Sequence, residues 1–359
     1  MTNNNDDLFP TNNEVPKISP LRPTNIKIET EEDLHLVRLL MGAQPTLLMV
    51  AAAEARVFDI LDENSMSSTE IANAAKFDQR AAKLVLDGLA GLGILKKKDG
   101  LYQNTAASFK HLRVDTNNSH AVRLWISGTR QWEQLPYILR TGKIPEGVNS
   151  LESWKQDKKE NNAFIRSMYD LGWMVAQDVI ESIDLSNVKH FVDLGGGPGQ
   201  YTIAALERSS EINATLVDLP LTLLVARSSL SQLALLHRTN LVECDLFDVS
   251  KDIPILPRTA DIVLISNVLH MESAQCNLIL IERAKQLLSP SGKIIIHEMF
   301  LEEDLIHPQA SSLFAVHLFA MTPNGELYPT SVICDWLSKA GIESRVIKTS
   351  PFLIEGVLC

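Results

Sequence analysis

The sequence has few cysteines, a deficit of basic residues and no long apolar run, and each shortage excludes a class of protein. Four cysteines in 359 residues, none in a CxxC pair, fit neither a disulfide framework nor a structural zinc site. With 33 basic against 44 acidic residues, the net charge of −11 repels nucleic acid and anionic lipid surfaces. The longest apolar run, Leu47 to Ala53, is far shorter than the ~20 residues that span a bilayer. We therefore expect a cytoplasmic protein that binds neither nucleic acid nor membranes.

The length and the apolar content together indicate two domains. At roughly 150 residues per domain, 359 residues suggest two, and the 45% of apolar residues is ample for two packed cores. Residues 1–28 are the exception, because they are rich in Asn and Pro and have too little apolar surface to offset the entropy of ordering. We expect them to form a flexible tail.

Residues 29–112 follow the pattern of a winged helix. Apolar residues at helical spacing and helix-start signals predict several helices, and Lys98-Asp99-Gly100 lies between two short extended segments. The predicted helices cover 36–40, 47–61, 67–75 and a segment that begins after Asp78.

A winged helix can bind DNA, so the candidate recognition helix decides what this domain does. That helix offers only Arg80 and Lys83 to phosphates and base edges. The segment 47–61 is apolar on more than one face, which indicates burial against another surface. We therefore expect a dimerisation domain rather than a DNA-binding one.

Residues 113–187 are predicted to be a helical, aromatic-rich connector that contributes to a substrate pocket. From residue 188 to the C-terminus, strands and helices alternate, which predicts an α/β, Rossmann-like domain with helices on both faces of a parallel sheet. Right-handed crossovers place every strand-to-helix loop along one carboxyl edge, where ligands bind. The predicted strands are 189–194, 214–218, 240–243, 261–265, 293–297, 343–348 and 352–358, with the clearest helices at 274–288 and 331–340.

A glycine-rich turn follows the first of these strands. The strand runs into Gly195, Gly197 and Gly199 before a helix begins, and Asp218 ends the next strand, where an acidic side chain takes up ribose hydroxyls. The spacing is GxGxG rather than the GxGxxG of dinucleotide folds, and no P-loop lysine follows. A cofactor with ribose and adenine but no pyrophosphate fits this pattern better, and S-adenosylmethionine is the common one.

Five stretches in this order resemble the small-molecule O-methyltransferases, a family that includes plant caffeate and chalcone-type enzymes, acetylserotonin O-methyltransferase and bacterial natural-product enzymes. The stretches are VDLGGGPGQ (192–200), LVDLP (216–220), CDLFD (244–248), ISNVLHMES (265–273) and SPSGKIIIHE (289–298). The resemblance implies that the glycine loop holds the methionine part of the cofactor, Asp218 the ribose, and Asp245 and Phe247 the adenine. The cofactor-binding residues expected on this basis are Asp193, Gly195, Gly197, Gly199, Asp218, Leu219, Asp245, Leu246, Phe247 and Ser266.

The same resemblance assigns a catalytic group. His270, just past the strand 261–265, corresponds to the family's general base, and Glu298 and Glu326 correspond to the glutamates that flank and orient it. One departure matters, because the family usually has His-Asp where this chain has His270-Met271. Some relatives with this fold bind the cofactor and catalyse pericyclic, decarboxylation or hydroxylation steps instead.

The acceptor pocket is expected to be apolar and aromatic. The helices expected to form it carry Trp125, Phe164, Met168, Trp173, Met174, Phe314, His317, Phe319 and Met321. Of these, the predicted substrate contacts are Met168, Trp173, Phe314 and Met321. No cluster of residues resembles a metal site. The sequence thus predicts a homodimeric, metal-independent O-methyltransferase that uses S-adenosylmethionine to methylate a hydroxyl of a small aromatic or polyketide- or peptide-derived metabolite. Two alternatives stay open at this point: a non-methylating enzyme on the same fold, and a winged-helix regulator with a ligand-sensing domain.

Overall fold

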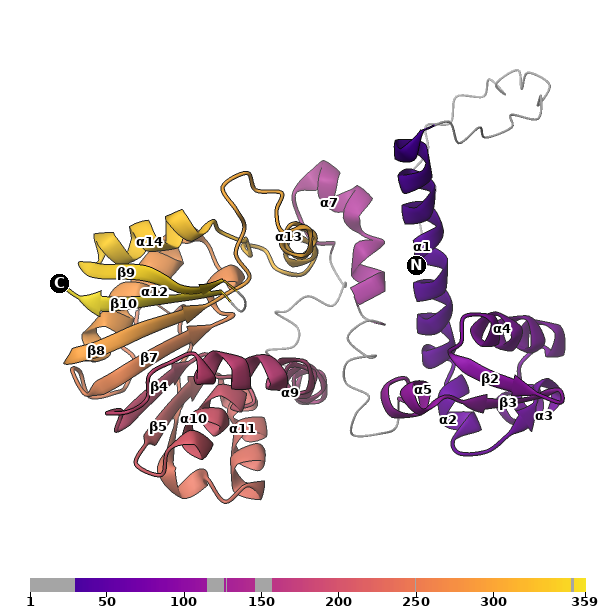
Figure 1. The fold of residues 1–359 in the computed structure, drawn as a ribbon, viewed down its shortest axis with the longest axis horizontal. Helices are drawn as coiled ribbons and strands as arrows, with labels where there is room; N and C mark the ends of the chain where they lie inside the picture. The colour runs from indigo at the N-terminus through magenta and orange to yellow at the C-terminus, as the bar shows by residue number, and fades with distance from the viewer. Residues whose placement is uncertain (1–29, 115–125, 127, 146–156, 249, 350–351) are drawn as a thin grey trace, which may run out of the picture. The chain divides into compact units, whose positions relative to one another are not determined.

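The computed structural model describes residues 30–114, 126, 128–145, 157–248, 250–349 and 352–359 (Figure 1). The chain divides into two compact units, residues 1–48 and 49–359. The predicted tail, residues 1–28, lies outside the described residues. The division at residue 48 falls within a helix and does not test the domain boundaries expected at residues 28, 112 and 187, which stay predictions.

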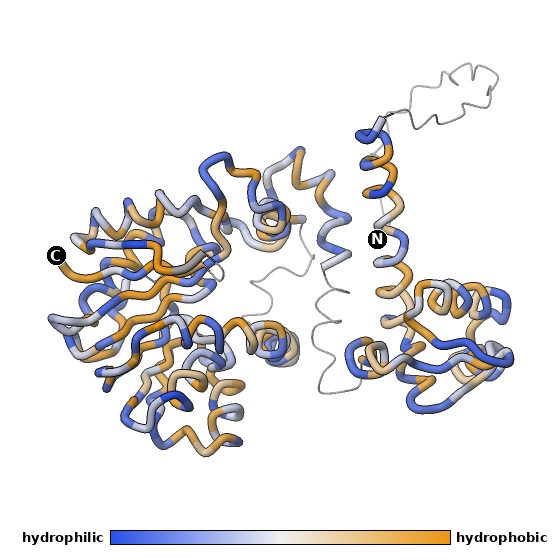
Figure 2. Tube along the Cα trace, in the orientation of Figure 1, coloured by the Kyte–Doolittle hydropathy of each residue, from blue (hydrophilic) through white to orange (hydrophobic). Residues whose placement is uncertain are grey.

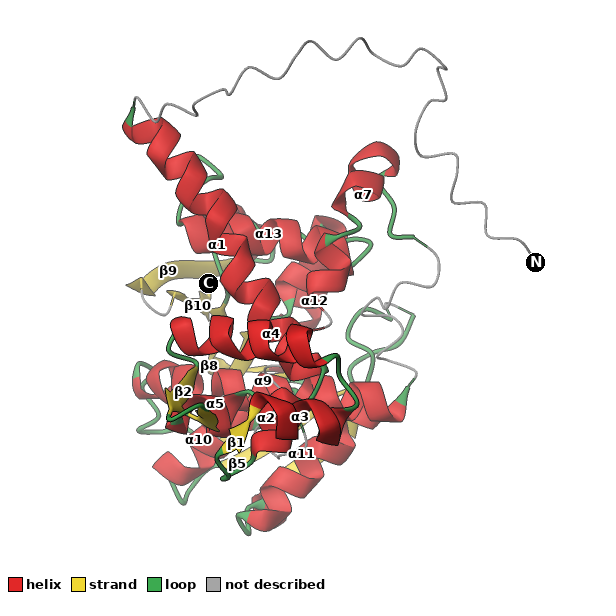
Figure 3. Ribbon diagram, turned by 90° about the vertical axis from the view of Figure 1, so that its right-hand side faces the viewer, coloured by secondary structure: helices red, strands yellow, loops and turns green. Residues whose placement is uncertain are grey.

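The N-terminal helix α1 (Glu31–Glu54) is one continuous helix, where the sequence predicted two separate segments (Figure 3). Pro45 lies inside it and removes one backbone donor, but the helix continues to Glu54. The break comes at Arg56, whose φ is 65°, before the short helix α2 (Val57–Leu61).

Large apolar side chains on α1 are exposed: Leu36, Leu39, Leu40, Met41 and Leu47. Among the described residues, α1 is also the one helix that is long and apolar enough to cross a membrane by length and composition, with only 11% of its most apolar window buried. An exposed apolar surface of this kind is typical of a contact surface.

The elements after α2 form the predicted winged helix. Its antiparallel sheet has the strand order β1-β3-β2. Ser67 and Glu70 form a capping box at one helix start and Asp78 caps the next, as their sequence positions predict. Lys83, one of the two cations on the candidate recognition helix, donates to Asp87 at 2.7 Å. The elements are β1 (Met66–Ser67), α3 (Ser68–Ala75), α4 (Gln79–Gly91), β2 (Leu95–Lys98), β3 (Leu101–Asn104) and α5 (Ala106–His111).

A seven-stranded sheet organises the C-terminal part, with the order β6-β5-β4-β7-β8-β10-β9. The first five strands in this order are parallel, and β10 is antiparallel to both of its neighbours. The predicted parallel sheet is therefore confirmed, with β8 beginning five residues earlier than expected because Leu288 pairs with Ala260 on β7. The strands are β4 (His190–Leu194), β5 (Asn213–Asp218), β6 (Thr239–Glu243), β7 (Ala260–Ser266), β8 (Leu288–His297), β9 (Ile342–Thr349) and β10 (Phe352–Leu358).

Both faces of this sheet are covered, so its central strands are apolar on both sides (Figure 2). Helices α12 and α14 supply one core, with Leu194, Ile265 and Ile296, and helices α9 and α10 supply the other, with Leu264 and Ile295. Successive residues of a strand face opposite sides. The helices are α7 (Leu135–Thr141), α9 (Lys158–Glu181), α10 (Gln200–Arg208), α11 (Pro220–Gln232), α12 (Ala274–Leu287), α13 (Gln309–Met321) and α14 (Thr330–Lys339), with short 3₁₀ turns η2 (Leu236–Arg238) and η3 (Leu269–Met271).

Candidate cofactor and catalytic site

The glycine loop follows β4 at the carboxyl edge and is shaped by close approaches. A Cβ on Gly195 would lie 2.5 Å from Val268 Cγ2, and Gly195 has a φ of 74°, which disfavours other residues. At Gly197 the φ is 55°, and an added Cβ would meet nothing within 4 Å. The loop is therefore packed against the protein at one point and open at the next, as a cradle for a ligand requires.

Asp218 ties this loop to the end of β5. Its Oδ2 accepts the Gly197 N–H at 2.8 Å and its Oδ1 accepts the Leu219 N–H at 2.7 Å. Burial of the carboxylate raises the pKa of Asp218. The two backbone donors thus hold the Asp218 carboxylate in place, at the position where the sequence predicts that ribose binds.

Asp193, the penultimate residue of β4, has a carboxylate oxygen with no hydrogen-bond partner in the described part of the chain. Its Oδ2 accepts the Thr202 hydroxyl at 2.7 Å, whereas its Oδ1 is buried without a hydrogen bond in the described part of the chain. Burial raises the pKa of Asp193 to about 7. A buried carboxylate of this kind has a strong requirement for a donor or a cation.

The segment after β6 carries the expected adenine residues. Asp245 Oδ1 accepts the Phe247 N–H at 3.0 Å, and Leu246 is buried in the core beside them. The buried Arg283 of α12 donates to the Leu246 carbonyl at 2.6 Å and to the Lys251 carbonyl at 2.5 Å. Sequence reasoning missed Arg283, because an arginine on a helix with no motif around it resembles a surface residue.

His270 stands on η3, directly beyond β7, and is held by a glutamate. Its Nδ1 lies 2.7 Å from Glu298 Oε2, and Glu298 Oε1 accepts the Leu269 N–H at 2.8 Å. The His270 and Glu298 residues are only 7% and 4% exposed. A carboxylate accepts and does not donate, so Nδ1 of His270 carries a proton, and Nε2 is the ring nitrogen that Glu298 leaves available.

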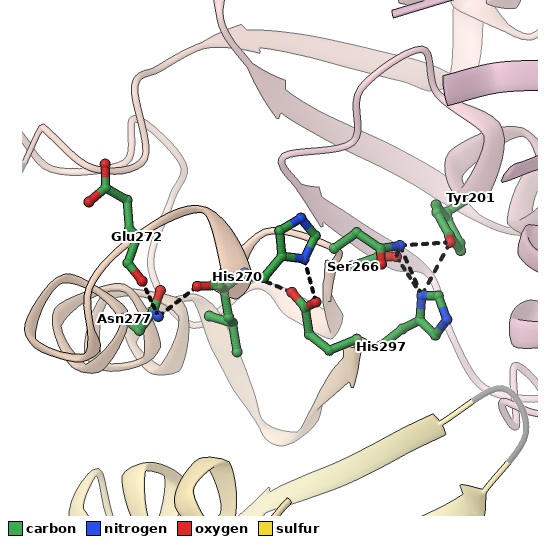
Figure 4. A network of polar contacts seen from close by, with 9 residues as sticks. Tyr201, Ser266, His270, Glu272, Asn277 and His297 are labelled. Atoms are coloured by element: carbon green, nitrogen blue, oxygen red, sulfur yellow. Dashed lines mark hydrogen bonds and ion pairs between the residues drawn. The ribbon is translucent and has the colours of Figure 1, made fainter. Parts of the chain in front are cut away.

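Two further side chains fix the turn that carries His270, and Figure 4 shows the first of them, Asn277. The fully buried Asn277 donates from Nδ2 to the Leu269 carbonyl at 2.7 Å and to the Glu272 carbonyl at 3.1 Å. The Tyr328 hydroxyl donates to the same Glu272 carbonyl at 3.0 Å. Neither residue was predicted as part of the site, and only their positions in the fold reveal them.

Glu326 meets His270 differently from Glu298. Its backbone N–H donates to the His270 carbonyl at 3.0 Å. Its carboxylate lies beside the Tyr328 hydroxyl, whose pKa is raised by burial and, to a smaller extent, by this carboxylate. The structure therefore brings both predicted glutamates to His270, Glu298 through its side chain and Glu326 through its backbone.

A second polar cluster surrounds His297, on the opposite face of β8 from Glu298 (Figure 4). The His297 Nδ1 lies 2.9 Å from the Ser266 hydroxyl, 3.2 Å from the Tyr201 hydroxyl and 3.3 Å from Asn267 Nδ2. Burial lowers the pKa of His297 to about 4, so the imidazole is neutral and its Nδ1 accepts. Ser266, predicted to bind cofactor, is buried within this cluster.

The four predicted acceptor residues fall in two different places. Phe314 on α13 packs edge-on against His270, with ring centroids 5.4 Å apart, and Met321 is buried at the end of the same helix. On α9, Trp173 stacks on Tyr169 at 5.4 Å and packs against a core, and Met168 is half-buried. Trp125 lies outside the described residues.

One group in the described part of the chain has the composition of a metal site. The ligand atoms of Glu302, Asp304 and His307 lie within 4.8 Å of one another, and all three residues are exposed. His307 Nδ1 is already engaged with Asp304 Oδ2 at 2.6 Å.

Comparison with known proteins relates these features to a family. An O-methyltransferase domain model matches residues 134–343, and an O-methyltransferase dimerisation domain model matches residues 37–113. The chain is 24% identical over 324 residues to 3-hydroxy-5-methyl-1-naphthoate 3-O-methyltransferase of Streptomyces sahachiroi, which covers 87% of this chain and 90% of that protein.

Solved structures of the same family share the fold. An O-methyltransferase family protein from Burkholderia thailandensis matches with a TM-score of 0.81 at 25% identity, covering 90% of this chain and 97% of that chain. Human N-acetylserotonin methyltransferase, solved in complex with SAM, matches with a TM-score of 0.76 at 23% identity, covering 92% and 99%.

The domain model covers more than half of the chain, including the glycine loop, His270 and Glu298. The second model covers α1 from residue 37 onward and the winged helix. The alternative of a winged-helix regulator is therefore wrong, since the winged helix is a dimerisation domain attached to an enzyme. This chain belongs to the S-adenosylmethionine-dependent O-methyltransferase family and has its Rossmann-like catalytic domain preceded by its dimerisation domain.

Proposed function

We propose that this chain uses S-adenosylmethionine to methylate a hydroxyl of a small aromatic or polyketide-derived metabolite, with His270 as the general base. The observation that carries the proposal is the buried pair of His270 and Glu298, joined at 2.7 Å. The pair supports a base because it leaves the Nε2 lone pair of His270 as the one proton acceptor on that ring.

The residues of the glycine loop fit the cofactor. The unpartnered Oδ1 of Asp193 suits an ammonium group, the Asp218 carboxylate suits ribose hydroxyls, and the open space at Gly197 leaves room for the ligand. Asp245 and Phe247 would hold the adenine. S-adenosylmethionine supplies, when bound, an activated methyl group on a sulfonium.

The chain's own residues handle the proton of the acceptor. Nε2 of His270 takes the hydroxyl proton, and the imidazolium that forms is stabilised by the Glu298 carboxylate on Nδ1. The Leu269 N–H on the second Glu298 oxygen and the Asn277 amide on the turn keep the ring in place. Phe314 packs against the ring edge and gives the acceptor an apolar wall.

The acceptor class follows from the relatives and the aromatic surroundings of His270. Proteins similar to this chain are named as methyltransferases of a hydroxynaphthoate, of mitomycin biosynthesis and of tetracenomycin polyketide synthesis. Their names support a small secondary metabolite as acceptor. The exposed apolar residues of α1 and the dimerisation model over residues 37–113 support a homodimer.

Replacing Asp218 is expected to weaken cofactor binding. Asp218→Ala removes charge-assisted hydrogen bonds that are worth ~1.5–3 kcal/mol each, so the affinity for S-adenosylhomocysteine in titration calorimetry falls at least tenfold. Asp252→Ala, an exposed carboxylate in the same domain, is the control and keeps the parent affinity. Equal affinities for the two variants would show that Asp218 does not contact the cofactor.

Replacing His270 is expected to stop the chemistry without releasing the cofactor. His270→Ala lowers the turnover of 2-naphthol by ~10²–10⁴, the usual effect of a positioned base, and Glu298→Gln lowers it by a smaller factor. The loss shrinks at high pH for an acidic phenol, because an ionised acceptor needs no base. Product mass spectrometry with labelled cofactor measures all three effects.

His237→Ala, an exposed histidine, serves as the control for that series. A His270→Ala enzyme that methylates at the parent rate would eliminate the base assignment. Substrate conversion without any methyl gain, across a panel of phenols and enols, would instead favour the non-methylating alternative.

Charges on α1 are expected to dissociate the dimer. Leu36→Glu with Leu40→Glu places two carboxylates on exposed apolar positions of one helix face, and burying them in an interface is costly. Sedimentation should show a dimer for the parent and a monomer for the variant, whereas Leu256→Glu, also exposed, leaves the dimer intact. A double variant that remains dimeric would place the interface elsewhere, and a parent that sediments with membranes would assign α1 to the bilayer.

A further inference from the structure

A second histidine, His317, is linked to the proposed base by the Phe314 ring, which contacts both imidazoles. Phe314 contacts His270 edge-on at 5.4 Å and contacts His317 at 5.9 Å with an interplanar angle of 30°. Both Phe314 and His317 are on α13, three residues apart, and both are half-buried. His317 therefore borders the same apolar wall as the catalytic pair.

Trp132 determines which nitrogen of His317 carries the proton. The Trp132 Nε1–H donates to His317 Nδ1 at 3.1 Å, and the two rings stack at 6.4 Å with an angle of 24°. An indole N–H is a donor only, so Nδ1 of His317 must keep its lone pair. The imidazole is then neutral with its proton on Nε2, and the burial that lowers the pKa of His317 acts in the same direction.

The Nε2–H that results is a donor with nothing to bind in the described part of the chain. Gly128 lies beside this edge of the ring without a side chain, since an added Cβ would be 3.7 Å from Cε1, the carbon between the two nitrogens. A donor beside the ring that packs on the proposed base, fixed in one tautomer by its neighbour, can select ligands by their acceptor oxygens.

We propose that His317 is a specificity-determining residue whose Nε2–H donates to a second oxygen of the methyl acceptor, a carbonyl or carboxylate on the same aromatic skeleton as the hydroxyl. This inference rests on the proposed function, since it names the acceptor class of that site. Hydroxyarenes with such an oxygen are preferred over simple phenols, and a carboxylate is preferred most, because bonds to ionised acceptors are the stronger ones.

Binding of two matched probes tests the preference without requiring turnover. The probes are 2-naphthol and 3-hydroxy-1-naphthoate, titrated calorimetrically into the full chain saturated with S-adenosylhomocysteine. The parent is expected to bind the naphthoate at least tenfold more tightly than the naphthol. Equal affinities, or no measurable binding of either probe, would overturn the proposal.

Three substitutions of His317 show which of its two ring nitrogens makes the contact with the probe. His317→Gln keeps an N–H at the reach of Nε2 and should retain most of the preference, whereas His317→Asn reaches only as far as Nδ1 and His317→Leu has no polar group, so both should lose it. Unchanged affinity for S-adenosylhomocysteine shows that each variant is folded. A preference that survives in both the Asn and the Leu variants would overturn the proposal.

Nitrogen-15 NMR of labelled histidine in the parent measures the tautomer directly. The expected His317 signal has an unprotonated Nδ1 and a protonated Nε2, and Trp132→Phe should remove this bias. A proton on Nδ1 in the parent would contradict the inference. Because neither measurement involves methyl transfer, a retained probe preference in an enzyme that methylates nothing would refute the proposed function and leave the role of His317 standing.

Discussion

The hydrogen bond between His270 and Glu298 is the constraint that the rest of the site serves. A glutamate that is 4% exposed and a histidine that is 7% exposed must satisfy each other, because an unpaired charge at this depth is strongly destabilising. The turn η3 has to hold the imidazole at the end of β7, and β8 has to deliver the carboxylate from the neighbouring strand. Asn277 of α12 and Tyr328 then fix this turn through its backbone carbonyls. Segments that are far apart in the sequence therefore hold one hydrogen bond in place.

The alternation of a β-strand separates the two polar clusters of this edge. His297 ends β8 on the face covered by α9 and α10, and Glu298 follows it on the face covered by α12 and α14. The neutral His297 accepts hydrogen bonds from β7 and from the first turn of α10, while Glu298 serves the base. One strand end thus joins the helix behind the glycine loop to the catalytic turn through two adjacent residues.

Sequence reasoning found what local patterns encode and missed what only tertiary contact reveals. The buried strands and the glycine loop follow from apolar runs and residue spacing, and the set of His270, Glu298 and Glu326 is expected from the resemblance to the family. Asn277 and Arg283 are single polar residues on an ordinary amphipathic helix, and nothing around them in the sequence marks them. The direction of a side chain is equally hidden, which is why Glu326 was expected at the imidazole and instead lies beside Tyr328.

Asp218 already binds the Gly197 and Leu219 amides, so the glycine loop has its shape before any ligand arrives. A preformed loop loses little conformational entropy on binding. It does not distinguish two ligands that differ only in a group outside its contacts, such as the methyl group. On the proposed function, it grips the adenosyl and amino-acid parts that the cofactor and its demethylated product have in common. Product therefore competes with fresh cofactor on nearly equal terms, and the ratio of cofactor to product, rather than the cofactor concentration alone, determines how much of the enzyme carries a methyl group.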